Sequence, residues 1–522
     1  MDSQTNVPTE IKLGVFGDAE IDVVFTAPDG SERRVPAFLA GDGSFRVRFA
    51  ALTPGKYTYR AICAYITGEI EIAPYEGDNP LYQHGRLRMA QNNRTLEHSD
   101  GAPFFWMGDT WWMGLTTRLD WPDGFFSLAT DRITKGFNLV QIVAGPLPNF
   151  DAVTESWHPM QANEAGLPWE ENWMRINPAY YDMADRRIAY LVEHGLMPCI
   201  VGMWGYYISF MGVENAKKHW RNLIARYGAY PVVWCIAGEV TLPTYSRHSD
   251  PKALAADQVS QAREWTEVAR YARELDPYHN LITAHPWITT GGRTAVTDET
   301  VLDIDMLQTD HGGHSILKQT VDWINIANTR KPRMPVINGE PCYEGVKGTG
   351  WKEMQRFVFW TSITSGSAGH TYGAQGIWQM STREEPYSQE WGEGFWREAM
   401  HYPGSAQVAM GRRFFERYPW WRFETRHLPE VEKLGRISSF ATGIPGAVWV
   451  FYLSGIWMDP IFAGVQGIRI PIEPGASYRA YFFDPRSGAE TDIGLVQPDS
   501  DGLWLHPAKP TMEDLILVLE ES

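Results

Sequence analysis

Two short apolar runs in this chain each end in a glutamate. The first is Val-Val-Trp-Cys-Ile-Ala-Gly-Glu at 232–239, and the second is Pro-Val-Ile-Asn-Gly-Glu at 335–340. Two carboxyl groups can split a glycosidic bond, because one protonates the leaving oxygen while the other attacks the anomeric carbon or activates a water. This chemistry requires the two side chains to face each other, so the elements that carry them must end on one side of the fold.

The pattern between residues 100 and 424 predicts these elements. Apolar strand-like runs alternate with longer amphipathic stretches, as in repeated βα units. Two stretches are typical helices: 178–194 starts with Pro178 and is followed by Gly195, and 257–276 is followed by Pro277. The eight candidate strands are 103–109, 137–144, 196–203, 232–239, 281–287, 304–310, 335–340 and 368–374. Eight units predict an α/β fold, a (β/α)₈ TIM barrel, with the two glutamates across its mouth on strands four and seven.

Both ends of the chain have a different pattern. Apolar and polar positions alternate in short segments separated by turn signals, such as Pro-Asp-Gly at 28–30 and Gly-Asp-Gly at 41–43. We therefore expect an N-terminal β-sandwich at 1–85, the catalytic barrel at 86–424 and a C-terminal β-sandwich at 425–522. No low-complexity linker separates the three parts, so they should pack together. The insertion 145–175, which contains Trp157, Trp169 and Trp173, is expected to cover the pocket.

The C-terminal ends of barrel strands form the active site in this fold. We expect Glu239 to be the acid/base, because burial near Trp and Cys would keep it protonated. Glu340 is then the nucleophile, held ionised by His311 or Tyr343, at the separation of ~5–5.5 Å that is typical of retaining enzymes. The remaining strand-end side chains are predicted to bind the sugar: Asp109, Trp111, Trp112, Gln141, Trp204, His285, Trp287, Gln308, His311, Tyr343, His370, Tyr372 and Trp378. Tyr206, Asp310 and Glu344 lie close to the same strand ends.

Several of these residues also have a structural interpretation. Trp111 and Trp112 are adjacent, so at most one can face the sugar while the other packs in the core. His285, His311 and His370 could be hydrogen-bonded core histidines. Asp109 could cap the helix that follows the first strand.

Composition narrows the partners. The formal net charge of −17 argues against nucleic acid and against an anionic membrane surface. No apolar run approaches the ~20 residues of a membrane span. The 23 tryptophans favour a carbohydrate partner, since indole rings stack on sugar faces. The oligomeric state, a homo-oligomer included, stays open. MDSQTNVPTE has no basic or apolar signal region, so we expect a cytoplasmic protein or a mature exported form.

Cysteine and histidine spacing predicts no cofactor and no metal site. Cys63, Cys199, Cys235 and Cys342 show no CxxC spacing, and three of them fall in apolar barrel runs, as buried thiols do. A metal-dependent barrel hydrolase would be expected to have a His-x-His pair at strand one, which here contains no histidine.

The motifs together carry a family likeness. HGRLRMAQNNRTLEHSDGAPFFWMGDTWWMGL at 84–115 resembles the junction of N-terminal sandwich and barrel in the apiosidase-like proteins of glycoside hydrolase family 140. The runs TAHPW, QTDH, PVINGEPCYEG and AGHTYGAQGIW are similar to that group's later motifs in matching order, and HYPGSAQVAMGRRFFERYPWW at 401–421 resembles its closing segment.

The resemblance implies a nucleophilic Glu340 and a terminal pentose or furanoside on a plant-type glycan. Strand four departs from the family, with Ala-Gly-Glu where members often carry Gly-Gly-Asp, and with Gly238 where many retaining barrels place Asn. The favoured hypothesis is a retaining exo-glycosidase. Two alternatives are a non-catalytic carbohydrate-binding protein on the same scaffold and the metal-dependent hydrolase.

Overall fold

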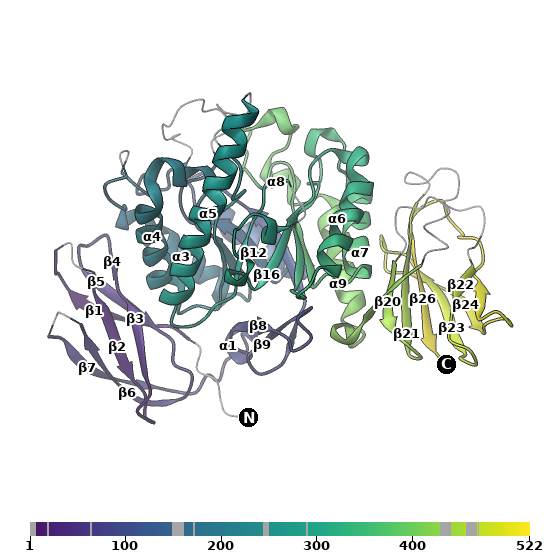
Figure 1. The fold of residues 1–522 in the computed structure, drawn as a ribbon, viewed down its shortest axis with the longest axis horizontal. Helices are drawn as coiled ribbons and strands as arrows, with labels where there is room; N and C mark the ends of the chain where they lie inside the picture. The colour runs from purple at the N-terminus through teal and green to yellow at the C-terminus, as the bar shows by residue number, and fades with distance from the viewer. Residues whose placement is uncertain are drawn as a thin grey trace.

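The structure is a computed structural model that describes residues 7–17, 20–62, 65–148, 161–170, 173–243, 250–288, 291–428, 440–455, 467 and 469–522. Figure 1 shows three parts side by side: an N-terminal pair of sheets, a barrel ringed by helices, and a C-terminal sheet region. Cys63 and Trp157 lie outside the described residues. No helix among the described residues is both long and apolar enough to cross a membrane.

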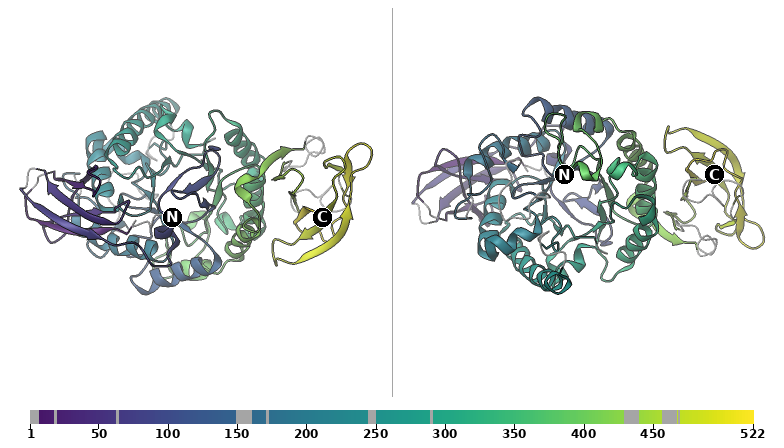
Figure 2. Two further views of the ribbon diagram at one scale, coloured as in Figure 1. Left: turned by 90° about the horizontal axis from the view of Figure 1, so that it is seen from below. Right: turned by 90° about the horizontal axis from the view of Figure 1, so that it is seen from above.

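The central part confirms the predicted TIM barrel. Its eight parallel strands close in chain order: β11 (Trp106–Trp111), β12 (Leu139–Val143), β13 (Met197–Val201), β14 (Val233–Cys235), β15 (Ile282–Ala284), β16 (Ile304–Gln308), β17 (Val336–Glu340) and β18 (Gly369–Tyr372). The helices surround the strands (Figure 2): α2 (Asp123–Lys135), α3 (Pro178–Glu193), α4 (Ile208–Tyr227), α5 (Pro251–Leu275), α6 (Leu317–Thr329), α7 (Lys352–Thr364), α8 (Trp396–Ala399) and α9 (Pro403–Phe415).

Local sequence sets where the helices start and end. The side chain of Asn177 accepts hydrogen bonds from the first turn of α3, and Asp250 does the same for α5. Each cap is followed by a proline at the first helical position, where the missing N–H has no role. Helix α5 therefore starts at Pro251, earlier than the expected 257.

The structure also differs from the prediction at the first, fourth and fifth strands and between the fifth and sixth strands. The first strand divides in two, because Pro103–Phe104 (β10) pairs antiparallel with β9 (Leu96–His98) and only Trp106–Trp111 joins the barrel. Strands β14 and β15 have only three residues each, so Glu239 and Trp287 lie on loops beyond them. Between β15 and β16 the described chain forms the 3₁₀ turns Gly292–Thr294 and Glu299–Val301 in place of an α-helix.

The N-terminal part consists of two antiparallel sheets in the orders β1-β5-β4 and β3-β2-β6-β7. A further sheet, β10-β9-β8, lies next to the barrel. Arg48 joins the N-terminal part to the barrel, since its Nη2 lies 2.6 Å from Asp185 Oδ2. The bounds are β1 (Thr9–Gly14), β2 (Asp22–Thr26), β3 (Glu32–Pro36), β4 (Phe38–Leu39), β5 (Phe45–Phe49), β6 (Gly55–Ala61), β7 (Thr67–Ile72), α1 (Pro80–Gln83) and β8 (Leu87–Met89).

The C-terminal part has a six-stranded sheet, β19-β20-β21-β26-β23-β24, and a two-stranded sheet, β22-β25, around an apolar core of its own. Its six-stranded sheet also packs against the barrel, because Val450, Phe483 and Ile516 belong to the barrel's core cluster. The bounds are β19 (Glu424–His427), β20 (Phe440–Ile444), β21 (Val448–Leu453), β22 (Arg469–Pro471), β23 (Tyr478–Phe483), β24 (Glu490–Val496), β25 (Leu503–Leu505) and β26 (Leu515–Glu521).

Candidate active site

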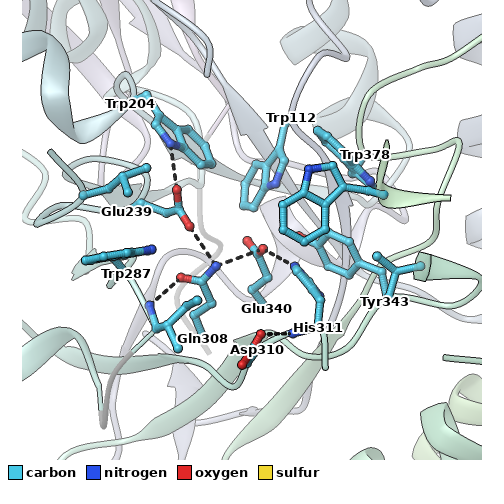
Figure 3. A pocket seen from close by; sticks show the side chains of 14 residues that line it. Trp112, Trp204, Glu239, Trp287, Gln308, Asp310, His311, Glu340, Tyr343 and Trp378 are labelled. Atoms are coloured by element: carbon cyan, nitrogen blue, oxygen red, sulfur yellow. Dashed lines mark hydrogen bonds and ion pairs between the residues drawn. The ribbon is translucent and has the colours of Figure 1, made fainter. Parts of the chain in front are cut away.

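A pocket of about 280 Å³ opens at the C-terminal ends of the barrel strands (Figure 3). Every lining residue lies at the end of a strand or on the loop that follows it, as the barrel geometry requires. The lining comprises Trp112, Trp204, Glu239, Leu242, Trp287, Ile288, Gln308, Asp310, His311, Glu340, Tyr343, Val346, Trp378 and Trp391. The two glutamates and most of the predicted aromatic residues therefore come together in one cavity.

Close packing behind Glu239 fixes its position. A Cβ atom on Gly238 would stand 2.3 Å from Cε3 of Trp204, so only glycine fits beside this ring. Trp204 Nε1 donates to Glu239 Oε2 at 3.0 Å. Glu239 itself has a φ of 45°, a left-handed conformation that non-glycine residues rarely adopt and that is found most often at functional sites.

The environment of Glu239 favours its protonated form. Burial raises the pKa of the Glu239 carboxyl to about 7, and the negative charge of Glu340 adds to the increase. Hydrogen bonds from Gln308 and Trp204 act in the opposite direction but do not overcome the burial. A carboxyl group in this state can donate a proton near neutral pH.

Glu340, at the end of β17, has the opposite environment. Burial by itself would raise the pKa of Glu340, but His285 and His311 lower it below its ordinary value. His285 Nε2 lies 2.9 Å from Oε2, and His311 Nε2 lies 2.8 Å from Oε1. His285 Nδ1 accepts the backbone N–H of Glu239 at 3.4 Å, so its proton is on Nε2, facing Glu340. Contacts with Glu340 and Cys342 outweigh the burial of His311 and raise the pKa of its imidazole to about 10.

Gln308 connects the two carboxyl groups. Its Nε2 donates to Glu239 Oε1 at 2.9 Å and to Glu340 Oε1 at 3.1 Å. The backbone N–H of Ile288 donates to Gln308 Oε1 at 2.9 Å, which fixes the orientation of the amide. The two glutamate oxygens that share Nε2 are therefore within about 6 Å of each other.

Aromatic rings form the walls of the pocket. The rings of Trp112 and Trp204 meet edge to face at 5.6 Å, and Trp112 meets His285 in the same way at 5.4 Å. On the other side, Trp391 packs against His311, and Lys347 Nζ lies 4.5 Å from the centre of the Trp391 ring. Flat apolar walls around a few fixed polar groups are typical of sugar sites.

The structure places a subset of the predicted sugar-binding residues in the pocket lining: Trp112, Trp204, Trp287, Gln308, His311, Tyr343 and Trp378. His285 is not part of this lining, but its Nε2 lies 2.9 Å from Glu340 Oε2. Of the adjacent tryptophans, Trp112 faces the pocket and Trp111 packs against Phe125 of α2, so only one of the two can meet a sugar.

The structure places the other five predicted residues away from the pocket lining, where they are fully or almost fully buried. They are Asp109, Trp111, Gln141, His370 and Tyr372. Asp109 accepts from Trp111 Nε1 at 2.7 Å and pairs with Arg132 at 2.6 Å, so it neither faces a sugar nor caps α2.

The other three displaced residues lie behind the site. Gln141 Nε2 donates to the carbonyl of Gly339, next to Glu340, at 2.8 Å. His370 packs edge to face on Phe359 of α7, and Tyr372 donates to Glu344 at 2.6 Å. Strand alternation explains the placement of His370 and Tyr372, because neighbouring residues of a barrel strand point to opposite faces of the sheet, and these two contact residues of α7 and α2. Gln141 instead reaches across the barrel from β12 to β17, which are not neighbours in the barrel.

Sequence reasoning did not identify four residues of the lining: Leu242, Ile288, Val346 and Trp391. They lie on loops beyond the strand ends, where no periodic pattern indicates direction. The sequence places Asp310 near a strand end, since Gln-Thr-Asp-His ends a strand, without assigning it to the sugar. Its φ of 78° allows Oδ1 to accept the backbone N–H of His311 at 2.5 Å.

Among the described residues, no group of three or more His, Cys, Asp and Glu side chains is arranged to hold a metal ion. The described cysteines Cys199, Cys235 and Cys342 are buried free thiols. Burial raises the pKa of Cys235 to about 12.

Comparison with known proteins identifies two domains in the chain. The sequence pattern of the apiosidase-like catalytic domain matches residues 90–422, and that of a domain of unknown function, DUF5060, matches residues 8–64. A search of curated proteins gave no match.

Solved structures share the fold. A glycoside hydrolase superposes with a TM-score of 0.66 at 21% identity, over 84% of this chain and 97% of its own. A glycoside hydrolase family 5 protein from Bacteroides vulgatus gives 0.67 at 21% identity, over 84% and 94%. A candidate glycoside hydrolase from the same strain gives 0.71 at 14% identity, over 99% of both chains. The match over the barrel shows that the chain belongs to the apiosidase-like family and is a glycosidase.

Proposed function

We propose that this protein is a retaining exo-glycosidase that removes a terminal sugar from a glycan by double displacement. In the first step, Glu340 attacks the anomeric carbon and forms an ester bond to it. The bond to the leaving oxygen breaks as Glu239 gives that oxygen its proton. In the second step, Glu239 takes a proton from water, the water oxygen attacks the anomeric carbon, and the ester bond to Glu340 breaks.

One observation carries the proposal: two buried carboxyl groups, whose Oε1 atoms lie within about 6 Å of each other, have environments that push their pKa values in opposite directions. Retaining glycosidases hold their carboxyl groups ~5–5.5 Å apart, whereas inverting ones leave ~6.5–9.5 Å for a water. The shared Gln308 amide supports the shorter separation. It also favours catalysis over a purely carbohydrate-binding role, which would need no such division of charge.

The size of the pocket supports exo action. At about 280 Å³ it is at the lower end of the ~300–1,000 Å³ range of ligand sites, and its walls are bulky indoles. Such a cavity fits the end of a glycan better than its middle. Family membership supports a pentose or furanoside as the terminal sugar. The Trp204 ring occupies the space beside Gly238, so the sugar hydroxyl that an asparagine there would bind must find another partner, for which Asp310 and Gln308 are placed.

The test is a panel of aryl glycosides of pentoses, deoxyhexoses and hexoses, with proton NMR of the first anomer released. We expect the anomeric configuration of the substrate to be retained on a pentoside. Glu340→Gln should lower kcat by a factor of about 10⁴ or more, as loss of a covalent nucleophile does. Glu267→Gln, on the half-exposed face of α5, is the matched control and should match the wild type.

Two results would contradict the proposal. First release of the opposite anomer would show an inverting mechanism. Unchanged turnover in Glu340→Gln would remove this residue from the chemistry altogether.

A further inference from the structure

A second and larger cavity lies at the opposite end of the barrel. It has a volume of about 1170 Å³ and is bounded by the β8–β10 sheet, the end of α6, the segment 331–333, and the segment 421–427 that contains β19. We call it the basal cleft. Lys331 and Arg333 precede β17, and Gly366 precedes β18, so the cleft lies at the N-terminal ends of strands whose C-terminal ends carry the active site.

The basal cleft is basic in an acidic protein. Five of its lining residues are lysine or arginine, namely Arg88, Arg94, Lys331, Arg333 and Arg422, whereas two are glutamates, Glu97 and Glu424. The whole chain has a formal net charge of −17. This local reversal of charge needs an explanation beyond general solubility.

Among the described residues, Arg88 is the only one of these five cations that forms a direct ion pair. Arg88 pairs with Glu97 at 2.9 Å. Lys331, Arg333 and Arg422 form no ion pair with any carboxylate in the described part of the chain. Burial lowers the pKa of Arg94, and the positive charge of nearby Arg333 lowers it further, while Glu424 acts in the opposite direction. Like charges held together with few carboxylates among them favour a bound anion.

The basal cleft also contains the exposed indole ring of a tryptophan whose backbone is held in place by a neighbouring loop. Trp421 is 39% exposed, which is unusual for so large an apolar side chain. Its carbonyl accepts hydrogen bonds from Arg94 Nη2 at 3.3 Å and from Asn92 Nδ2 at 3.4 Å, so the 90–95 loop and the tryptophan backbone hold each other in place. Guanidinium groups bind carboxylate and sulfate oxygens in pairs, while an indole stacks on a sugar face.

We propose that the basal cleft binds an acidic polysaccharide chain, with Arg94, Arg333 and Arg422 on its carboxylate or sulfate groups and Trp421 against a sugar ring. The partner is a glycan because this chain is a glycosidase and because the exposed ring suits a sugar face. The five residues of β17 separate the two sites by roughly 15 Å, so the cleft is an anchoring site separate from the chemistry. The inference does not depend on which sugar the active site removes.

The experiment is isothermal titration of the full chain with three polysaccharide fragments: alginate for carboxylates, dextran sulfate for sulfates, and dextran as the neutral reference. We expect the wild type to bind at least one anionic fragment, to leave dextran unbound, and to bind more weakly as salt is raised. Arg94→Ala with Arg333→Ala should weaken binding by roughly tenfold, and Trp421→Ala should weaken it as well.

The matched control is Arg263→Ala with Arg479→Ala, which removes the same charge from exposed positions on α5 and β23. It should bind like the wild type. If only one of alginate and dextran sulfate binds, that result identifies whether the cleft binds carboxylate or sulfate groups. The proposal is overturned by no anionic binding, by equal binding of dextran, or by an equal loss in the control and cleft variants. Thermal unfolding of each variant confirms that it is folded.

Discussion

At the residue scale, the two glutamates of the site have the same side chain but opposite electrostatic environments. Glu239 is buried against Trp204 in a left-handed conformation, whereas Glu340 has two imidazoles within 3 Å. Burial disfavours the charge of Glu239, and the histidines stabilise the charge of Glu340. The proposed acid and the proposed nucleophile therefore differ in their surroundings before a substrate arrives.

The first prediction concerns pH. Glu239 must be protonated to donate, so kcat/KM on an aryl glycoside should fall tenfold per pH unit above about 7. Glu340 must be ionised, and its lowered pKa should keep the acid side flat down to at least about pH 5. His311→Asn removes one stabilising imidazole, so its acid limb should move upward while the basic limb stays. A wild-type basic limb near the ordinary glutamate value would contradict the assignment of Glu239.

Position at the strand ends predicted that Glu239 and Glu340 would face one pocket. The adjacency of Trp111 and Trp112 predicted that only one of these rings would face it. The sequence did not indicate toward which face of its strand each of the remaining side chains would point. Asp109 is an example, because its buried partner Arg132 lies 23 residues away on α2. Such pairing has no local pattern, so sequence reasoning placed Asp109 in the pocket.

At the element scale, another buried carboxyl group links β18 and α9 next to the pocket. Glu344 follows β17, accepts a hydrogen bond from Tyr372 of β18 at 2.6 Å, and accepts the backbone N–H of Gly404 in α9 at 3.1 Å. Burial raises the pKa of Glu344 to about 7. The adjacent Tyr343 lines the pocket, so this link holds one wall of the site.

The second prediction is a pH-dependent stability. A raised carboxyl pKa in the folded state means that the contribution of Glu344 is complete below its ordinary value near 4.5 and is lost as pH rises through about 7. The contribution of Glu344 to the unfolding free energy should therefore fall between pH 5 and pH 8, while the buried His219 and His370, whose pKa values are lowered, change the total in the opposite direction. Relative to the wild type, Glu344→Gln should gain up to about 3 kcal/mol of unfolding free energy at pH 8 compared with pH 5, as measured by urea unfolding at both pH values. The exposed substitution Glu416→Gln is the control; equal differences in all three proteins would contradict the account.

The number of barrel strands was predictable because each buried barrel strand is an apolar run between amphipathic helices. The residues at which the strands begin and end were less predictable. Pro103–Phe104 continues the apolar run of β11, yet it pairs with β9 instead. That choice depends on the β8–β10 sheet, which forms from residues whose own apolar signal is weak.

At the scale of the whole molecule, the C-terminal part is joined to the barrel through a buried ion pair as well as apolar packing. Arg356 of α7 contacts both carboxylate oxygens of Asp514, at 2.6–3.1 Å, and both side chains are almost completely buried. An ion pair with both charges removed from water is destabilising when one member is lost, because the other is left unpaired.

The third prediction follows from this pair. Asp514→Ala should lower the unfolding free energy by about 3–5 kcal/mol. Asp492→Ala, which breaks the exposed pair with Arg479, should lower it by about 1 kcal/mol or less. Replacing both buried partners by Arg356→Met and Asp514→Leu should recover part of the loss. If Asp514→Ala and Asp492→Ala lowered the unfolding free energy by similar amounts in urea, the Arg356–Asp514 ion pair would not have the predicted importance for stability.

The three-part organisation could be predicted from the change in apolar period, but the basal cleft could not. Its basic residues range from Arg88 to Arg422, in a chain whose total charge is strongly negative. Only the closed barrel brings them to one surface, so neither composition nor a motif indicated them.

The most direct test of the central claim is to identify the residue that bonds to the sugar. The protein would be incubated with an activated 2-deoxy-2-fluoro glycoside of the best substrate, and the labelled peptide would be located by mass spectrometry. We expect one sugar per chain, attached at Glu340, and a loss of turnover in proportion to the fraction of chains labelled. A label on Glu239, or stoichiometric labelling elsewhere with Glu340 unmodified, would contradict it.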